Sequence, residues 1–358
     1  MKNLTEYLIN NIKPIFEKDE AWYNMLPDAN LDICKKNLKL FFNIMYERQM
    51  IWKRRFIDKK EQPWTDNKYF QNIKFTNVYR ELDRSCQWEI KNIICDDNLS
   101  LKDLIWKMMV YRYFNKPETF IFGEKYWKNG IPSWKEYNKI TFAKFIGEFR
   151  NEFNDTPFTA AYTIYNADGM TRDEFYLNNV IPFTHKHIDE LINIVKNANA
   201  PEDIINFLKT FPAMSNFLSH EVYQDFTYIA KYTKREFMKF GPNDFTNVGP
   251  GSKMGLRLIY PNISKVDQQK EHFGILKDLA GEYLADISKT KGENFPYLYW
   301  DMDKKQYYVG DECNITLNQI EMWLCEFFKY WKITACNMPY RKAFVPKTKE
   351  LIIGCNKK

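Results

Sequence analysis

Charged side chains alternate with large aromatic ones in residues 74–90, which read KFTNVYRELDRSCQWEI. Arg80, Asp83 and Arg84 recur at the spacing of one helical face, so the pattern predicts an amphipathic helix with an ionic face. An arginine three residues before Asp83 would favour the ionised form of that carboxyl. Such a face could present a carboxylate and two guanidinium groups to a substrate, although a helix with a solvated polar face gives the same pattern.

The sequence lacks the patterns of several other chemistries. Of the four histidines only His185 and His187 are close, and no carboxylate or thiol completes a zinc-binding spacing, so we expect no metal. The run GPGSKMG at 249–255 has too few residues between its glycines and its lysine for a Walker motif. No GxSxG turn and no Cys–His pair supports acyl transfer. We expect no cofactor.

Composition sets broad limits on the class of protein. The 358 residues are 45% hydrophobic and 17% aromatic, enough for a sizeable core rather than disorder. Lys and Arg exceed Asp and Glu by 52 to 46, which permits a nucleic-acid partner without requiring one. Seven scattered cysteines without a CxxC are typical of free thiols in a reducing cytosol. Charges interrupt the apolar N-terminal run, so we expect no signal peptide, no membrane segment and a cytoplasmic location.

Apolar residues at three- and four-residue intervals predict a mostly α-helical chain. Only FYLNNVIPF (175–183) and YLYWDMDKKQYYVG (297–310) look strand-like, the second as a hairpin or surface loop. No flexible Gly/Ser linker separates the parts. We therefore expect a single compact unit over 1–358, with one lobe formed by 1–150 plus 311–358, a second by 151–310, and a site in a cleft between them.

A helix, a tight turn and a second helix are predicted for residues 203–231, which read DIINFLKTFPAMSNFLSHEVYQDFTYIAK. The turn and the N-terminus of the second helix could direct N–H groups at a DNA phosphate. Further along the chain, Gly249 and Gly251 would let the backbone approach a ligand closely, and Ser252 would cap the next helix. The same pattern is also typical of two packed helices followed by a rigid loop, without any ligand.

Six segments follow one another in a specific order along the chain. They are ERQMIWKRRF (47–56), PWTDNKYFQNIKFTNVYRELDRSCQW (63–88), YRYFNKPET (111–119), LKTFPAMSNFLSHEVYQDFTY (208–228), NVGPGSKMGL (247–256) and EMWLCEFFKY (321–330). This ordered series resembles the alpha-glutamyl/putrescinyl thymine pyrophosphorylase family, whose helical module also follows a kinase domain in 5-hydroxymethyluracil DNA kinases. The resemblance covers about residues 45–330 and includes no kinase half.

The resemblance implies a two-lobed helical fold similar to the helix-hairpin-helix DNA glycosylases, with at most a small β-hairpin, and an enzyme acting on a modified pyrimidine in DNA. Some members replace pyrophosphate on an activated 5-methyl group with an amine, and related members excise bulky modified bases. Either reaction requires the base to leave the stack, at a cost of about a few kcal/mol. The chain departs from those glycosylases, because Ala213, Met214 and Ser215 replace their glycine-rich hairpin and the position of their catalytic aspartate falls near Gly249.

Excision needs a carboxylate that stabilises an oxocarbenium-like sugar or activates water. The candidates within the motifs are Asp83, Asp225, Asp244 and Glu326. Each could instead serve structure: Asp83 in a salt bridge, Asp225 on a polar helix face, Asp244 in a turn, and Glu326 in an exposed pair with Lys329.

Amine transfer would instead need a cationic site for pyrophosphate, for which Arg80, Arg84, Lys253 and the glycine loop could serve, and an amine pocket that nothing in the sequence identifies. Phosphates of DNA could be gripped by Lys53, Arg54 and Arg55, and by Lys231, Lys234 and Arg235 after the hairpin. The residues expected to contact DNA or the base are Arg55, Asn77, Arg80, Arg84, Asn115, Ser215, Asn216, Gly249, Gly251, Ser252, Lys253 and Lys329.

Because no signal for a second substrate is found, the sequence favours excision. We therefore expect a DNA glycosylase that flips out and removes a hypermodified, phage-type pyrimidine, in a role that suits antiviral defence. Two alternatives stay open: a hypermodification transferase that installs an amine, and a non-catalytic reader of modified DNA. The expected partner is DNA carrying modified pyrimidines, with no membrane and no obligate protein partner.

Overall fold

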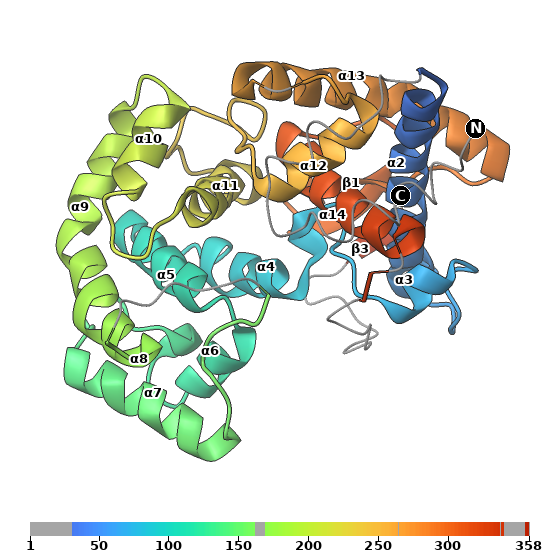
Figure 1. The fold of residues 1–358 in the computed structure, drawn as a ribbon. Helices are drawn as coiled ribbons and strands as arrows, with labels where there is room; N and C mark the ends of the chain where they lie inside the picture. Colours follow the sequence, from blue (N-terminus) through green and yellow to red (C-terminus); the bar gives the residue numbers. More distant parts are fainter. Residues whose placement is uncertain (1–30, 162–168, 264, 337, 340–354, 358) are drawn as a thin grey trace. The chain divides into compact units, whose positions relative to one another are not determined.

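The computed structural model describes residues 31–161, 169–263, 265–336, 338–339 and 355–357 (Figure 1). The chain divides into two compact units: unit 1 is Met1–Arg80, Val248–Asp301 and Gln306–Lys358, and unit 2 is Glu81–Asn247 and Met302–Lys305. The expected single body, with lobes 1–150 plus 311–358 and 151–310, stays a prediction. Within the described ranges, none of the helices is long and apolar enough to cross a membrane.

Long helices that pack against one another form the core of unit 1. They are α2 (Leu31–Trp52), α12 (Pro250–Ile259), α13 (Val266–Lys291) and α14 (Leu317–Ala335). Phe41 and Phe42 of α2, Leu276 of α13 and Phe327 of α14 are fully buried among them. The apolar faces read from the sequence therefore meet in one core, which is the main source of stability for amphipathic helices.

Shorter elements complete unit 1. A π-helical turn, η2 (Lys53–Ile57), continues α2, and α3 (Lys68–Asn72) follows it. Strands β1 (Tyr297–Asp301) and β2 (Gln306–Gly310) pair antiparallel from Tyr297↔Gly310 to Asp301↔Gln306, and β3 (Cys355–Lys357) pairs parallel to β2. The hairpin expected at 297–310 is confirmed, as is a mostly α-helical fold with a small β component. The likeness to helix-hairpin-helix glycosylases stays a prediction.

Unit 2 is built around α5 (Leu101–Phe114), in which every residue from Leu104 to Phe114 is buried. Helices α9 and α11 and the π-helical turn η4 pack on it. The elements of this unit are α4 (Arg84–Glu89), η4 (Ile90–Ile94), α5, α6 (Pro117–Gly123), η5 (Lys128–Gly130), α7 (Lys139–Phe153), α8 (Arg172–Phe175), η6 (Tyr176–Val180), α9 (Ile181–Asn197), α10 (Pro201–Leu208) and α11 (Asn216–Tyr232).

Residues 175–183, which look strand-like in the sequence, are helical. They run from the end of α8 through η6 into α9. Thr171 and Glu174 form a capping box that starts this helical run, and the buried Tyr176, Val180 and Ile181 lie at helical spacing. The strand prediction is wrong because a short apolar run fits a buried helix as well as a strand.

The stretch 74–90 does not form the single helix that its spacing predicts. Arg80 lies in a 3-10 turn, η3 (Arg80–Leu82). Asp83 then has an extended backbone and is the N-cap residue of α4, which begins at Arg84. The expected helical face shared by Arg80, Asp83 and Arg84 is therefore wrong, because the chain leaves the helical conformation at Asp83.

The helix–turn–helix expected at 203–231 is confirmed by α10 and α11. In the turn, Ala213 has a φ of 69°, in the left-handed region that an L-residue adopts infrequently. Ser215 is the N-cap of α11, and its hydroxyl accepts a hydrogen bond from the Leu218 N–H at 3.2 Å. Phe211 and Met214 are buried beneath the turn, so the hairpin is a fixed element of unit 2.

Candidate functional site

Four charged side chains meet in the interior of unit 2, and we call them the Arg112 cluster: Glu89 of α4, Arg112 of α5, and Glu221 and Asp225 of α11. The Arg112 guanidinium binds Asp225 with two nitrogens, Nε to Oδ2 at 2.6 Å and Nη2 to Oδ1. Glu221 Oε2 lies 3.4 Å from Nη1, and Glu89 Oε2 lies 3.3 Å from Nη2. None of the four side chains is more than 6% exposed.

The charge balance of the Arg112 cluster favours a protonated Glu89. Three carboxyl groups surround one guanidinium, and a buried charge is costly without a partner. Burial raises the pKa of Glu89 well above its ordinary value, the charges of Asp225 and Glu221 raise it further, and Arg112 opposes the shift. Glu89 Oε1 is buried and has no hydrogen-bond partner among the described residues. The cluster can therefore hold one proton in a buried site.

Aromatic packing fixes the helices that carry the cluster. Trp88 of α4 stacks on Tyr111 of α5 with ring centroids 4.9 Å apart. The Tyr111 hydroxyl donates to the Ser85 carbonyl at 2.7 Å. Glu89 is thereby held at the junction of α4 and the π-helical turn η4. Such π-helical turns occur frequently at functional sites.

Asp225 is the one predicted catalytic carboxylate that lies in this cluster, and its side chain is 2% exposed. Its proposed role in catalysis stays a prediction, and the described structure gives it an ion-pairing role. Sequence reasoning missed Glu89, Arg112 and Glu221. A signal was present, because Glu221 and Asp225 are four residues apart and share a face of a predicted helix.

The other predicted carboxylates lie elsewhere. Asp244 is exposed and accepts a hydrogen bond from the Gly241 N–H at 2.6 Å, which is the turn position expected as its alternative. Glu326 pairs with Lys329 at 3.0 Å on α14, and Lys329 Nζ also donates to the Lys74 carbonyl at 2.5 Å. Asp244 thus has the turn contact named as its alternative, and Glu326 forms the named pair with Lys329, although its side chain is only 13% exposed.

The glycine-rich segment 249–255 forms the beginning of α12 rather than an open loop. Gly249 is the N-cap residue, and a Cβ on Gly251 would lie 2.9 Å from Cys325 Sγ of α14. A Cβ on Gly255 would lie 2.1 Å from the Leu324 carbonyl oxygen. The Cβ position of Gly251 therefore faces α14, and its expected approach to a ligand stays a prediction.

Ser252 does not cap α12. It lies inside the helix, and its hydroxyl donates to the Gly249 carbonyl at 3.0 Å. Glu321 Oε1 would lie 3.3 Å from a Cβ on Gly249, so a carboxylate already lies beside this helix N-terminus. Burial raises the pKa of the neighbouring Cys325 thiol well above its ordinary value, so the thiol stays neutral and unreactive.

Most cations expected to contact DNA are engaged within their own unit. Arg55 stacks on Phe56 and Trp64, with its Cζ 4.7 and 4.9 Å from the ring centroids, and burial lowers its pKa. Arg84 pairs with the half-exposed Glu118 at 2.7 Å. The other pairings are Lys53 with Glu293 and Asp58, Arg54 with Glu47, Lys231 with Glu81, Lys234 with Asp303, and Arg235 with the Asp96 and Asp97 carbonyls.

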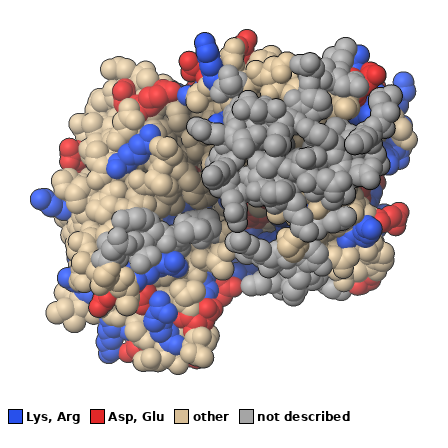
Figure 2. Space-filling model, viewed as in Figure 1, with Lys and Arg blue, Asp and Glu red and all other residues tan. Residues whose placement is uncertain are grey.

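Other predicted contact residues fall into three classes by burial. Asn77 and Asn115 are buried, Lys253 is half-buried, and Ser215 and Asn216 are exposed at the N-terminus of α11. On the face seen in Figure 2, Lys and Arg lie among Asp and Glu instead of in a separate basic field. Within the described part of the chain, no group of three His, Cys, Asp or Glu residues could hold a metal.

Comparison with known proteins identifies the family. A family model described as "5-hmdU DNA kinase, helical domain" matches residues 35–338. The chain is 29% identical over 317 residues to the 5-hmdU DNA kinase of Bacillus phage SP10, a match that covers 84% of this chain and 46% of the relative. The chain thus spans about half the length of that relative. No solved structure matches.

These comparisons correct the expected chemistry. The phage relative is named a kinase, which points to phosphorylation of a modified base and not to cleavage of its glycosidic bond. Neither alternative, amine transfer or passive reading of modified DNA, matches that activity. The resemblance read from the motifs is confirmed: the chain belongs to the family of the 5-hmdU DNA kinase helical domain.

Proposed function

We propose that this chain is the DNA- and base-holding part of an enzyme that phosphorylates 5-hydroxymethyluracil in DNA. The observation that carries the proposal is the family match over residues 35–338. The phage relative, named a 5-hmdU DNA kinase, supplies the reaction class and the substrate class.

The reaction defines what each part of such an enzyme must do. The 5-hydroxymethyl oxygen attacks the terminal phosphorus of a nucleoside triphosphate, the bond to the nucleoside diphosphate breaks, and the hydroxyl proton passes to a base. The base must also leave the stack, at a cost of about a few kcal/mol. The sequence has no phosphate-binding loop of Walker spacing. We therefore assign this chain to the holding of DNA and the extruded base, not to the binding of the triphosphate.

Features of unit 2 support a holding role. The hairpin α10–α11 exposes Ser215 and Asn216 at the N-terminus of a 17-residue helix, where free N–H groups favour phosphate oxygens. The Arg112 cluster ties the same helix to α4 and α5 through Glu221 and Asp225. A rigid support of this kind lowers the ordering cost of binding.

The experiment compares the affinity of the full chain for three duplexes of one sequence. They carry 5-hydroxymethyluracil, thymine or 5-hydroxymethylcytosine at one position, and binding is measured by fluorescence anisotropy at several salt concentrations. We expect the tightest binding to 5-hydroxymethyluracil at every salt concentration, because phosphate contacts are common to all three duplexes. Mass spectrometry of the recovered DNA should show an intact base. Equal affinity for all three duplexes would overturn the proposal.

A further inference from the structure

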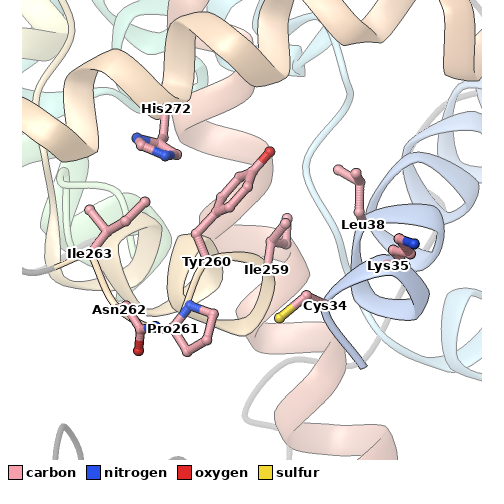
Figure 3. A pocket seen from close by; sticks show the side chains of 9 residues that line it. All are labelled: Cys34, Lys35, Leu38, Ile259, Tyr260, Pro261, Asn262, Ile263 and His272. Atoms are coloured by element: carbon pink, nitrogen blue, oxygen red, sulfur yellow. The ribbon is translucent and has the colours of Figure 1, made fainter. Parts of the chain in front are cut away.

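Unit 1 contains a pocket of about 360 Å³ that shares no residue with the Arg112 cluster or the α10–α11 hairpin. Its walls come from the first turns of α2, the C-terminal end of α12 with the loop after it, and α13 (Figure 3). Leu38, Ile259, Pro261 and Ile263 make the walls mainly apolar. Pockets of this size and composition, with a few polar groups, are typical of small-molecule sites.

An aromatic pair forms one side of the pocket. Tyr260 and His272 meet edge to face with ring centroids 4.8 Å apart. His272 Nδ1 lies 2.7 Å from the Gln268 carbonyl, so that nitrogen carries the proton and Nε2 can accept a hydrogen bond. Burial raises the pKa of the Tyr260 phenol. Its hydroxyl therefore stays a hydrogen-bond donor at neutral pH.

Three polar side chains on this pocket have no protein partner within the described part of the chain. Lys35 has no carboxylate partner there, and neither the Asn262 amide nor the Tyr260 hydroxyl has a hydrogen-bond partner. The lining contains one cation, Lys35, and no Asp or Glu. In contrast to most of the predicted DNA-contact cations, this ammonium is available to an anion.

We propose that this pocket binds a small aromatic anion with the chemistry of a pyrimidine nucleoside monophosphate. The ring lies against the apolar walls beside Tyr260 and His272, where stacking and edge contacts stabilise a flat heterocycle. The anionic group pairs with the Lys35 ammonium, and the Asn262 amide and Tyr260 hydroxyl supply hydrogen bonds to polar ring or sugar atoms. No covalent step is involved.

The experiment titrates the full chain by calorimetry with three probes that separate ring from anion. They are thymidine 5′-monophosphate, thymidine and ribose 5-phosphate. We expect the monophosphate to bind most tightly, thymidine more weakly and ribose 5-phosphate not measurably. Absence of monophosphate binding at roughly millimolar concentration would overturn the proposal, as would equal binding of ribose 5-phosphate.

Two lysines of the same helix provide a matched pair of variants. Lys35→Ala should weaken monophosphate binding by about three- to tenfold, with less than about a twofold effect on thymidine. Lys39→Ala removes an exposed lysine one turn further along α2, outside the pocket lining, and should leave both affinities unchanged. Ile263→Phe should weaken both ligands by filling the pocket, with urea denaturation as the check on folding. Equal effects of the two lysine variants, or unaltered binding in a folded Ile263→Phe protein, would contradict the assignment.

Discussion

The family motifs form different kinds of contact in the two units. In unit 2, YRYFNKPET and LKTFPAMSNFLSHEVYQDFTY supply Arg112, Glu221 and Asp225 to a buried ionic cluster. In unit 1, NVGPGSKMGL and EMWLCEFFKY bring α12 so close to α14 that a Cβ on Gly255 would overlap the Leu324 carbonyl. These motifs thus form a buried ionic cluster in unit 2 and a close helix–helix contact in unit 1.

The comparison shows that a motif residue with catalytic potential can serve the architecture. Asp225 is held by two guanidinium nitrogens, and Gly251 faces a neighbouring helix. The Lys35, Asn262 and Tyr260 side chains, which lack protein partners in the described structure, line the unit 1 pocket, outside those motifs. A polar residue is therefore a candidate for ligand binding when the fold leaves it unsatisfied.

The largest expected effect tests whether charge pairing holds unit 2 together. Arg112→Met leaves three buried carboxyl groups without their cation and should lower the free energy of unfolding by about 3–5 kcal/mol. Urea denaturation of the full chain measures this loss. In the control, Arg84→Met removes a half-exposed partner of Glu118 and should cost less than about 1 kcal/mol. Similar losses in both variants would show that the cluster is not a stabilising centre.

The next effect tests close packing in unit 1. Gly255→Ala places a methyl group 2.1 Å from a backbone carbonyl oxygen, so α12 must move from α14, at a cost of about 2–3 kcal/mol. The matched control is Gly274→Ala in α13, where a Cβ meets nothing within 4 Å. Alanine there should stabilise the helix by up to about 1 kcal/mol. Thermal denaturation separates the two, and a neutral Gly255→Ala would contradict the packing account.

The proton on Glu89 makes the free energy of unfolding depend on pH. Because its pKa is raised, mainly by burial, the folded chain binds this proton more tightly than the unfolded chain. The resulting stabilisation is fully present below the pKa of Glu89 in the unfolded chain, about 4.3. It is lost as the pH rises through the raised pKa of Glu89 in the folded chain. A tenfold difference in proton affinity corresponds to about 1.4 kcal/mol.

Glu89→Gln mimics the protonated side chain and should flatten this decline in unfolding free energy between about pH 5 and about pH 8. Urea titrations at each pH measure the slope, and the exposed Glu118→Gln serves as the control. If wild type and Glu89→Gln showed the same slope, Glu89 would not carry the proton.

The smallest effect separates capping from DNA contact in the hairpin. Ser215→Ala removes the side-chain cap of α11 and should lower stability by about 1 kcal/mol. Its effect on DNA binding should be small, because the backbone N–H groups of the helix remain. Asn216→Ala leaves that cap in place. It should lower the affinity for DNA and leave the free energy of unfolding nearly unchanged. Loss of DNA affinity with Ser215→Ala at unchanged stability would assign the hydroxyl to DNA.

Sequence periodicity predicted the helices, the α10–α11 hairpin and the β1–β2 hairpin, because each depends on local spacing and turn residues. Periodicity gave the wrong secondary structure for two segments whose conformation depends on tertiary contacts. The run 175–183 is helical because Tyr176, Val180 and Ile181 are buried together. The 74–90 helix is interrupted at Asp83, whose extended backbone precedes α4.

The composition of the candidate site was less accessible to sequence reasoning. Glu89 and Arg112 lie 23 residues apart, and Arg112 and Asp225 lie 113 apart, so no local pattern connects them. The pocket combines α2, α12 and α13 through contacts between residues more than 200 positions apart, such as Asn37 Nδ2 with the Leu258 carbonyl at 2.6 Å. Such convergence becomes visible only when the helices are packed.

We propose that this family member holds 5-hydroxymethyluracil in DNA for phosphorylation. The decisive measurement is the ratio of the affinities of the full chain for duplexes carrying 5-hydroxymethyluracil and thymine, at matched salt concentrations. We expect a ratio well above one that persists as salt weakens both complexes. A ratio of one would rule out selective holding of the modified base.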